Sequence, residues 1–145
     1  MKKTLIISSL IIFIIACGNM KKLPKKDNIT IQGVMLSNDF SSYSRESSET
    51  QIINANINDS ILTLNVNYNG GCKDHEFQLI GSKMIQKSSP PIRNIMLAHN
   101  SNDDNCRELV EKELKFNISD FKYPNRDIML ALQNYKPKIL FKAID

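Results

Sequence analysis

Cysteine, histidine and acidic residues gather in one part of the sequence. A first motif reads Gly-Gly-Cys-Lys-Asp-His-Glu-Phe and contains Cys72 and His75. A second begins at His99-Asn100 and continues through two aspartates to Cys106. Thiolates, imidazoles and carboxylates bind transition metals, and imidazoles also move protons near neutral pH. These two motifs are therefore the candidate functional region.

The two cysteines of these motifs predict a disulfide. A third cysteine, Cys17, lies in the N-terminal segment discussed below, so Cys72 and Cys106 form an even pair. Even numbers of cysteines in exported domains usually form disulfides. The alternatives are two free buried thiols, or a structural zinc site made with the two histidines. The spacing differs from that of a zinc finger, and an oxidising compartment favours the disulfide.

The two histidines admit a binding role and a structural one. With the thiols bonded to each other, copper or zinc would be held by the histidines and by acidic neighbours. The candidate metal ligands are His75, His99, Asp103 and Asp104, with Asp74 as a further acidic side chain. In the structural alternative, each imidazole hydrogen-bonds loop backbone and closes one end of the fold.

Recognisable catalytic motifs are missing from the sequence. It contains no Gly-x-Ser-x-Gly, no His-Glu-x-x-His and no phosphate-binding glycine loop. The acidic residues around Glu111 alternate with basic ones, which is typical of a solvated face. We therefore expect a binding or structural module, with a small envelope enzyme or enzyme inhibitor as the alternative.

Period-two hydrophobic alternation predicts the elements that position the two motifs. The clearest run is 61–68, where every second residue from Leu62 to Tyr68 is apolar. Other strands are expected near 29–31, 53–57, 75–79, 95–99, 114–118, 128–132 and 139–143. About seven or eight short strands predict a mainly β domain, an antiparallel sandwich of the Ig-like or Greek-key type.

Three local features complete this expectation. In the run 53–57, Ile53 is expected to share the inner face with Ala55 and Ile57. The Ser-rich segment 37–50 is expected to be a long exposed loop, and 103–110 a short helix with acidic residues at its N-terminus. If the runs 75–79 and 95–99 pair as antiparallel neighbours, both histidines lie at one end of the sheet.

The N-terminal segment is typical of an export signal. Two lysines precede an apolar run at 5–16, which is too short to cross a hydrocarbon core about 30 Å thick. The run ends in Ile14-Ile15-Ala16-Cys17, which resembles the lipobox of bacterial lipoproteins. The resemblance implies that Cys17 receives a diacylglycerol, that the chain is cut before it, and that its new N-terminus is acylated, for example with palmitate. Such acyl chains would hold the protein on a membrane.

The same resemblance divides the chain into three parts. Residues 1–16 are the signal that is removed, 17–28 the lipidated N-terminus and a basic tether, and 29–145 a single domain. With Gly18 directly after the lipidated cysteine, the chain resembles lipoproteins that are sorted to the outer membrane of bacteria with two membranes. We therefore expect a protein of the cell envelope that is attached to the membrane by its lipid.

The charge distribution argues against a nucleic-acid partner. The chain has 19 basic and 15 acidic residues, for a formal charge of +4. Six of the basic residues lie in 1–28, which leaves 13 basic against 14 acidic residues in 29–145. The domain is nearly neutral, whereas nucleic-acid binding needs a basic surface. The expected partners are the membrane and an envelope protein or small ligand.

Overall fold

The computed structural model describes residues 30–39, 42–43 and 47–143. The lipobox and the tether lie outside the described residues. Among the helices that are described, none combines the length and the apolar character needed to span a membrane.

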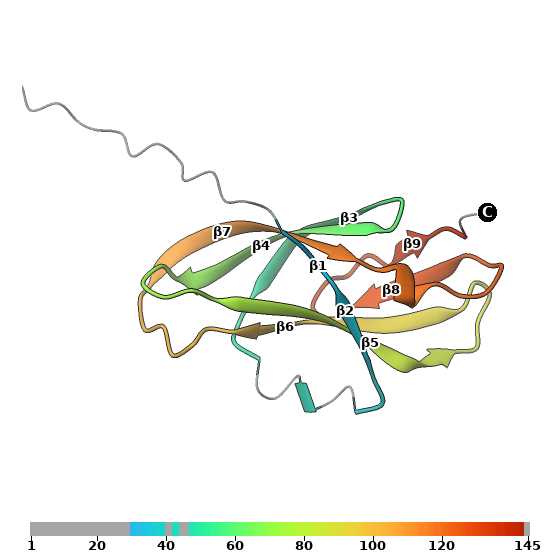
Figure 1. Ribbon diagram of the computed structural model, residues 1–145, viewed down its shortest axis with the longest axis horizontal. Helices are drawn as coiled ribbons and strands as arrows, with labels where there is room; N and C mark the ends of the chain where they lie inside the picture. Colours follow the sequence, from blue (N-terminus) through green and yellow to red (C-terminus); the bar gives the residue numbers. More distant parts are fainter. Residues whose placement is uncertain (1–29, 40–41, 44–46, 144–145) are drawn as a thin grey trace, which may run out of the picture.

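Within the described residues, nine strands form two sheets, and the mainly β character expected from the sequence is confirmed (Figure 1). One sheet has the order β1-β7-β4-β3 and the other β2-β5-β6-β8-β9. A 3-10 turn, η1 (Ser119–Phe121), follows β7. The strands are β1 (Ile31–Gln32), β2 (Val34–Ser37), β3 (Gln51–Asn58), β4 (Ile61–Gly70), β5 (Glu76–Gln86), β6 (Ile92–Asn100), β7 (Glu108–Asn117), β8 (Ile128–Leu132) and β9 (Ile139–Phe141).

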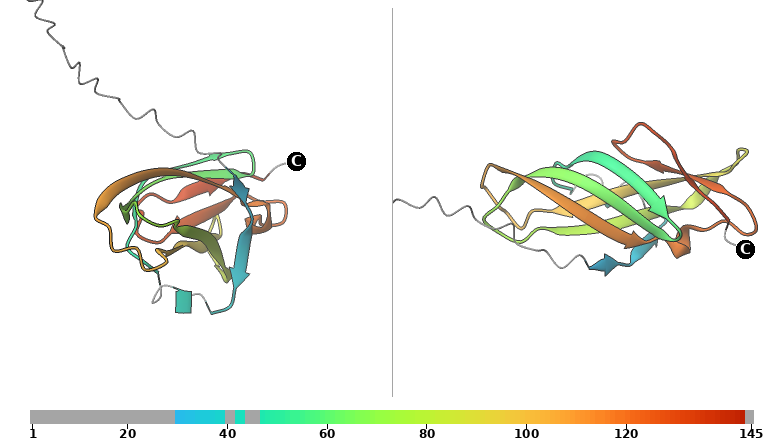
Figure 2. Two further views of the ribbon diagram at one scale, coloured as in Figure 1. Left: turned by 60° about the vertical axis from the view of Figure 1, so that its left-hand side comes forward. Right: turned by 90° about the horizontal axis from the view of Figure 1, so that it is seen from above.

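The sheets are mixed, so the expectation of antiparallel pairing throughout is wrong. Three neighbouring pairs run parallel: β1 with β7, β2 with β5, and β6 with β8. The chain leaves β6 for β7 in the opposite sheet before it returns as β8, and this excursion lets β8 run in the direction of β6. Strands β1 and β2 are separated only by Gly33, and β1 lies at an edge of the first sheet whereas β2 lies at an edge of the second, so the chain crosses between the sheets there (Figures 1 and 2).

The inner faces of the two sheets share one hydrophobic core. The alternation read from 61–68 is confirmed, because Leu62, Leu64 and Val66 of β4 are at most 1% exposed. They pack in one cluster with residues of the opposite sheet such as Leu79 and Ile95. Each fully buried aliphatic side chain of this kind contributes about 1.5–3 kcal/mol relative to an exposed one.

A β-bulge changes which residues of β3 face this core. Ile52 pairs with Val66, but Asn54 pairs with Asn65, so Ile53 is the extra residue between them. Ile53 is 50% exposed, whereas Ile52 and Ala55 pack against the core. The expectation that Ile53 lies on the inner face is therefore wrong, because an inserted residue reverses the alternation on one side of it.

The short helix expected at 103–110 is also absent from the structure, and β7 begins there at Glu108 instead. Asn102 and Asp103 adopt positive φ angles of 51° and 55°, which a right-handed helix does not allow. The Asp104 carboxylate accepts the main-chain N–H of Cys106. Aspartate side chains compete with helix formation by such local bonds.

Residues 47–50, expected as part of an exposed loop, lie against the end of β6. Ser48 N donates to His99 O at 2.7 Å, and His99 N donates to Ser47 Oγ at 3.0 Å. Ser101 N donates to Ser48 Oγ at 3.3 Å. These bonds hold the segment 47–50 beside the end of β6, which brings Thr50 to the candidate functional region.

Candidate functional site

The register of β5 and β6 brings the two histidines together. Phe77 of β5 pairs with His99 of β6, and His75 lies two residues before Phe77. His75 is 8% exposed and His99 2% exposed. The structure therefore places both imidazoles at one end of the sheet, as the alternation of the two runs predicted.

A chain of hydrogen bonds runs through both imidazoles. His75 Nε2 lies 3.1 Å from Asp104 Oδ2, and His75 Nδ1 lies 2.7 Å from His99 Nε2. His99 Nδ1 in turn lies 2.7 Å from the hydroxyl oxygen of Thr50. We call Asp104, His75, His99 and Thr50 the histidine relay.

The Asp104 carboxylate and a neutral His75 together set the direction of every bond in the histidine relay. An ionised carboxylate only accepts hydrogen bonds, so His75 donates from Nε2–H to Asp104. In a neutral His75 the Nδ1 atom then accepts from His99 Nε2–H, and His99 Nδ1 accepts from the hydroxyl of Thr50. The relay therefore fixes the tautomer of both rings and the orientation of the Thr50 hydroxyl.

Main-chain donors hold Asp104 in its ionised form. Its carboxylate accepts N–H bonds from Cys106, Lys73 and Cys72, each at 2.9 Å. These bonds, with that from His75, lower the pKa of Asp104 far below its ordinary value, although desolvation opposes the shift. The side chains of Asp104 and His75 are each 1% exposed, so the anion is held inside the protein.

Burial keeps His99 uncharged at neutral pH. Desolvation lowers its pKa from the ordinary 6.5, and the repulsion from Lys112 and from His75 whenever that ring is protonated lowers it further, whereas backbone hydrogen bonds with Glu49 and Ser48 raise it. Its ring is stacked on Phe77, with centroids 4.4 Å apart and planes at 10°. The Tyr68 ring lies 4.6 Å from that of His75 and 5.1 Å from that of His99.

Gly70, in the first motif, is required by this packing. A Cβ atom at Gly70 would lie 2.6 Å from both Cε1 and Nε2 of His75, and 3.2 Å from Asp104 Oδ2. No real Cβ contact is that short, so any side chain at Gly70 would displace His75 from Asp104. The absence of a side chain at Gly70 thus makes room for His75 and Asp104 of the histidine relay.

The predicted disulfide is present between Cys72 and Cys106. Their Cα atoms are 5.9 Å apart, within the range that a disulfide spans without moving the backbone. The bond joins the turn before β5 to the loop before β7. Both flanking segments also donate main-chain N–H groups to Asp104, so the covalent link and the carboxylate hold the same two stretches of chain.

The four candidate metal ligands separate into two groups. His75, His99 and Asp104 lie together in the histidine relay, whereas the contact described for Asp103 is its carbonyl oxygen, which accepts from Lys73 Nζ at 2.9 Å. Two imidazole nitrogens bound to one zinc ion at about 2.0–2.1 Å with a tetrahedral angle lie about 3.3 Å apart. The facing nitrogens of the histidines are 2.7 Å apart and bonded to each other. This geometry favours proton sharing over chelation.

Reduction of the disulfide would create a different ligand set. The sulfur atoms of Cys72 and Cys106 and a carboxylate oxygen of Asp104 lie within 4.8 Å of one another. We expect Zn²⁺ to bind the reduced chain through its two thiolates and to bind the oxidised chain at least about tenfold more weakly, because thiolates are the softest ligands available. Isothermal titration with and without a phosphine reductant measures the difference. If the Cys72→Ser/Cys106→Ser variant bound Zn²⁺ as tightly as the reduced native chain does, the assignment of the two thiolates as zinc ligands would be contradicted.

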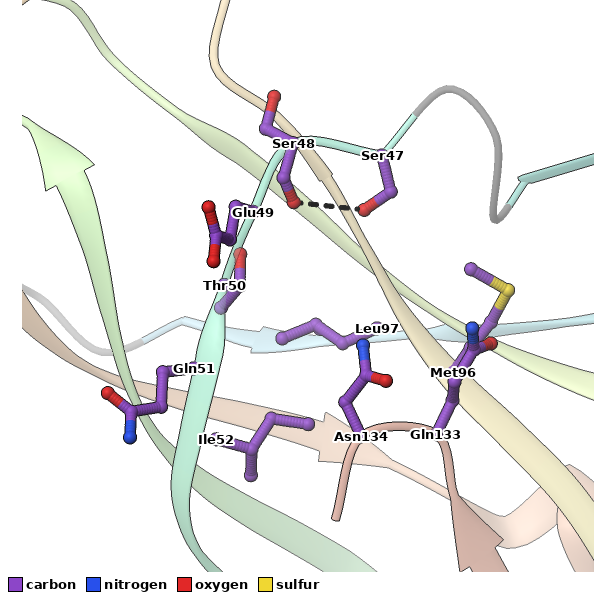
Figure 3. Close-up of a pocket in the computed structure, with 10 residues that line it drawn as sticks. All are labelled: Ser47, Ser48, Glu49, Thr50, Gln51, Ile52, Met96, Leu97, Gln133 and Asn134. Atoms are coloured by element: carbon purple, nitrogen blue, oxygen red, sulfur yellow. Dashed lines mark hydrogen bonds between the residues drawn. The ribbon is translucent and has the colours of Figure 1, made fainter.

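The outer end of the histidine relay borders a cavity of about 510 Å³ (Figure 3). Strand β8 pairs with β6 only over residues 92–95, and Ser48 bonds to β6 at His99. Met96 and Leu97, between these two points, form the floor of a notch in the sheet. Its walls are Ser47, Ser48, Glu49, Thr50, Gln51 and Ile52 on one side and Gln133 and Asn134 on the other.

No sequence pattern predicted that these wall residues lie together. Thr50 and its serine neighbours belong to a polar stretch without hydrophobic alternation, and Gln133 and Asn134 follow the end of a strand. Their importance depends on where β8 ends and on how 47–50 is held to β6. Both are tertiary features, so no local pattern announces them.

Comparisons with known proteins support the fold. No protein-family model matches the chain, and no curated protein matches it. It resembles the solved structure of a protein of unknown function, DUF1344, from Bacteroides vulgatus, with a TM-score of 0.57 and 18% identity over 80% of this chain and 58% of that one. A NigD-like immunity protein from Bacteroides caccae gives a TM-score of 0.54 and 15% identity, over 78% of this chain and 59% of that one.

A third similar structure is a putative toxin-related protein from Parabacteroides distasonis, with a TM-score of 0.50 and 19% identity over 78% of this chain and 59% of that one. The chain thus spans less than two thirds of the length of each of these structures. At such low identity the likeness establishes a shared β fold and nothing about activity.

Proposed function

We propose that this protein is a lipid-anchored, extracytoplasmic binding module of a bacterial cell envelope. The lipobox-like sequence Ile14-Ile15-Ala16-Cys17 supports the anchor, and the basic residues of 17–28 support a tether close to anionic lipid heads. The Cys72–Cys106 disulfide supports export, because such bonds persist in oxidising compartments. In a bacterium with two membranes, Gly18 favours the outer one.

The observation that carries the binding role is the notch between β8 and the segment 47–50. Its volume of about 510 Å³ is within the range of about 300–1,000 Å³ typical of ligand sites. Hydroxyl, amide and carboxylate groups line it over an apolar floor, so the notch offers several hydrogen-bonding partners as well as an apolar contact surface. The histidine relay holds one wall in place through Thr50. The occupant would be a small ligand or a short segment of an envelope protein.

Fatty-acid labelling in a bacterial host tests the anchor. We expect cells fed an alkyne fatty acid to label the native chain at Cys17, and the Cys17→Ala variant to remain unlabelled and uncleaved, because only the lipobox cysteine accepts the diacylglycerol. The matched control is Cys72→Ser/Cys106→Ser, which should label like the native chain. A labelled Cys17→Ala chain, or an unlabelled native one, would overturn the anchor.

A further inference from the structure

The floor of the notch presents main-chain hydrogen-bonding groups. On the outer edge of β6, Ile95 O accepts from Gln133 N at 2.9 Å and His99 O accepts from Ser48 N at 2.7 Å. Main-chain groups of alternate strand residues point to the same edge, so N–H and C=O of Leu97 face the notch as well. Among the described residues, the bonds on this edge engage Ile95 and His99 but not Leu97 between them. Leu97 thus offers one donor and one acceptor.

The length of the notch matches a short piece of extended chain. Four residue steps separate Ile95 from His99, which corresponds to about 13 Å along a strand. A segment of about three extended residues fits between Gln133 and Ser48. Such a segment would continue the line of β8 along β6 and close the gap in the sheet.

The walls suit the side chains and amides of such a segment. Hydroxyls of Ser48 and Thr50 line one side, and the amides of Gln133 and Asn134 line the other (Figure 3). The Ile52 side chain offers an apolar contact beside Leu97. Side chains of an extended chain alternate between the two faces of a sheet, so one set would meet these walls while the main chain pairs with β6.

We propose that the notch binds a short extended segment of a partner protein, which pairs with the main chain of Leu97 and completes the sheet. This inference rests on the proposed function as a binding module and names the class of its partner. In such β-augmentation the main-chain bonds supply affinity, and the pockets for alternate side chains supply specificity. Recognition would involve about three residues, so the affinity for an isolated peptide is low.

Titration of the ¹⁵N-labelled chain from Gly18 onward tests the proposal by NMR. This chain keeps all the described residues and their shared core. The probe is the blocked tripeptide acetyl-Thr-Val-Thr-amide at millimolar concentration. We expect the largest shift at the Leu97 amide, with further shifts at Ser48 and Gln133. A probe methylated on the valine nitrogen loses a donor and should bind about tenfold more weakly, the value of a hydrogen bond of about 1.4 kcal/mol.

A matched pair of variants localises the site. Gln133→Trp fills the notch and should abolish the shift at Leu97, whereas Gln86→Trp places the same side chain on an exposed glutamine of β5 outside the notch and should leave it unchanged. Absence of a Leu97 shift with the tripeptide overturns the proposal. Shifts at Leu97 with N-acetylglucosamine oligomers alone would replace it by a carbohydrate site and leave the binding module standing. Failure of the anchor appears separately, in the Cys17 labelling.

Discussion

A chain with both Cys72 and Cys106 replaced by serine should have a free energy of unfolding about 3–4 kcal/mol below that of the native chain. The two cysteines are 34 positions apart, and the cost follows from the closure entropy of a loop of that length in the unfolded state. Small domains have a total of about 5–15 kcal/mol, so this loss is a large share of it. Urea unfolding at pH 7, followed by circular dichroism, measures the difference.

The fold should survive the substitution, because Asp104 holds the same segments without the disulfide. Its carboxylate accepts N–H groups from Cys72, Lys73 and Cys106, and these donors belong to the main chain and remain in the serine variant. The native chain treated with a phosphine reductant is the control, and its unfolding midpoint should fall to that of the variant, which the reductant leaves unchanged. A variant as stable as the oxidised native chain would show that the bond constrains little.

The sequence predicted the placement of the two histidines of the candidate site, because this placement depends on strand alternation. The period-two pattern of β4 identified Leu62, Leu64 and Val66 as core residues, and these are buried. The same period around Phe77 and Leu97, together with the assumption that these two runs pair as antiparallel neighbours, predicted that His75 and His99 lie at one end of the sheet, and the pairing of β5 with β6 is confirmed. The even cysteine pair followed from composition and was confirmed as a disulfide.

Other parts of the fold and of the candidate site, including Thr50, depend on features that no local pattern encodes. A single inserted residue at Ile53 reversed the alternation of β3. The acidic start of 103–110 favoured a helix, but the same Asp104 side chain satisfies main-chain donors of two loops and holds the segment in a turn. Thr50 joins the histidine relay only because hydrogen bonds to His99 hold 47–50 beside β6, where β8 no longer pairs with it. Parallel pairing likewise follows from excursions to the other sheet.

Acidification should destabilise the protein through the histidine relay, starting near pH 6.5. The pKa of His99 is lowered in the folded chain from its ordinary 6.5, so the unfolded chain binds the proton more tightly. The stabilisation from this group is complete above pH 6.5 and is lost as the pH falls toward the folded pKa, with a slope that approaches about 1.4 kcal/mol per pH unit. The pKa of Asp104 is also lowered in the folded chain, so a second loss of stability begins as the pH falls below its ordinary value of 3.8. Urea midpoints measured from pH 8 to pH 3 would show both.

The variant His99→Gln separates the first loss from the second. A glutamine amide can donate to His75 Nδ1 and its oxygen can accept from Thr50, so the bonds of the relay persist without the imidazole of His99. We expect its stability to be flat where the native chain loses stability between pH 6.5 and the folded pKa of His99, and to fall like the native chain below pH 3.8. An unchanged slope near pH 6 would assign that loss to another group.

Because the Thr50 hydroxyl donates to the nitrogen of His99 that acid would protonate, protonation there breaks the bond that holds the wall of the notch. Acid should therefore weaken tripeptide binding in the native chain at a higher pH than it does in His99→Gln.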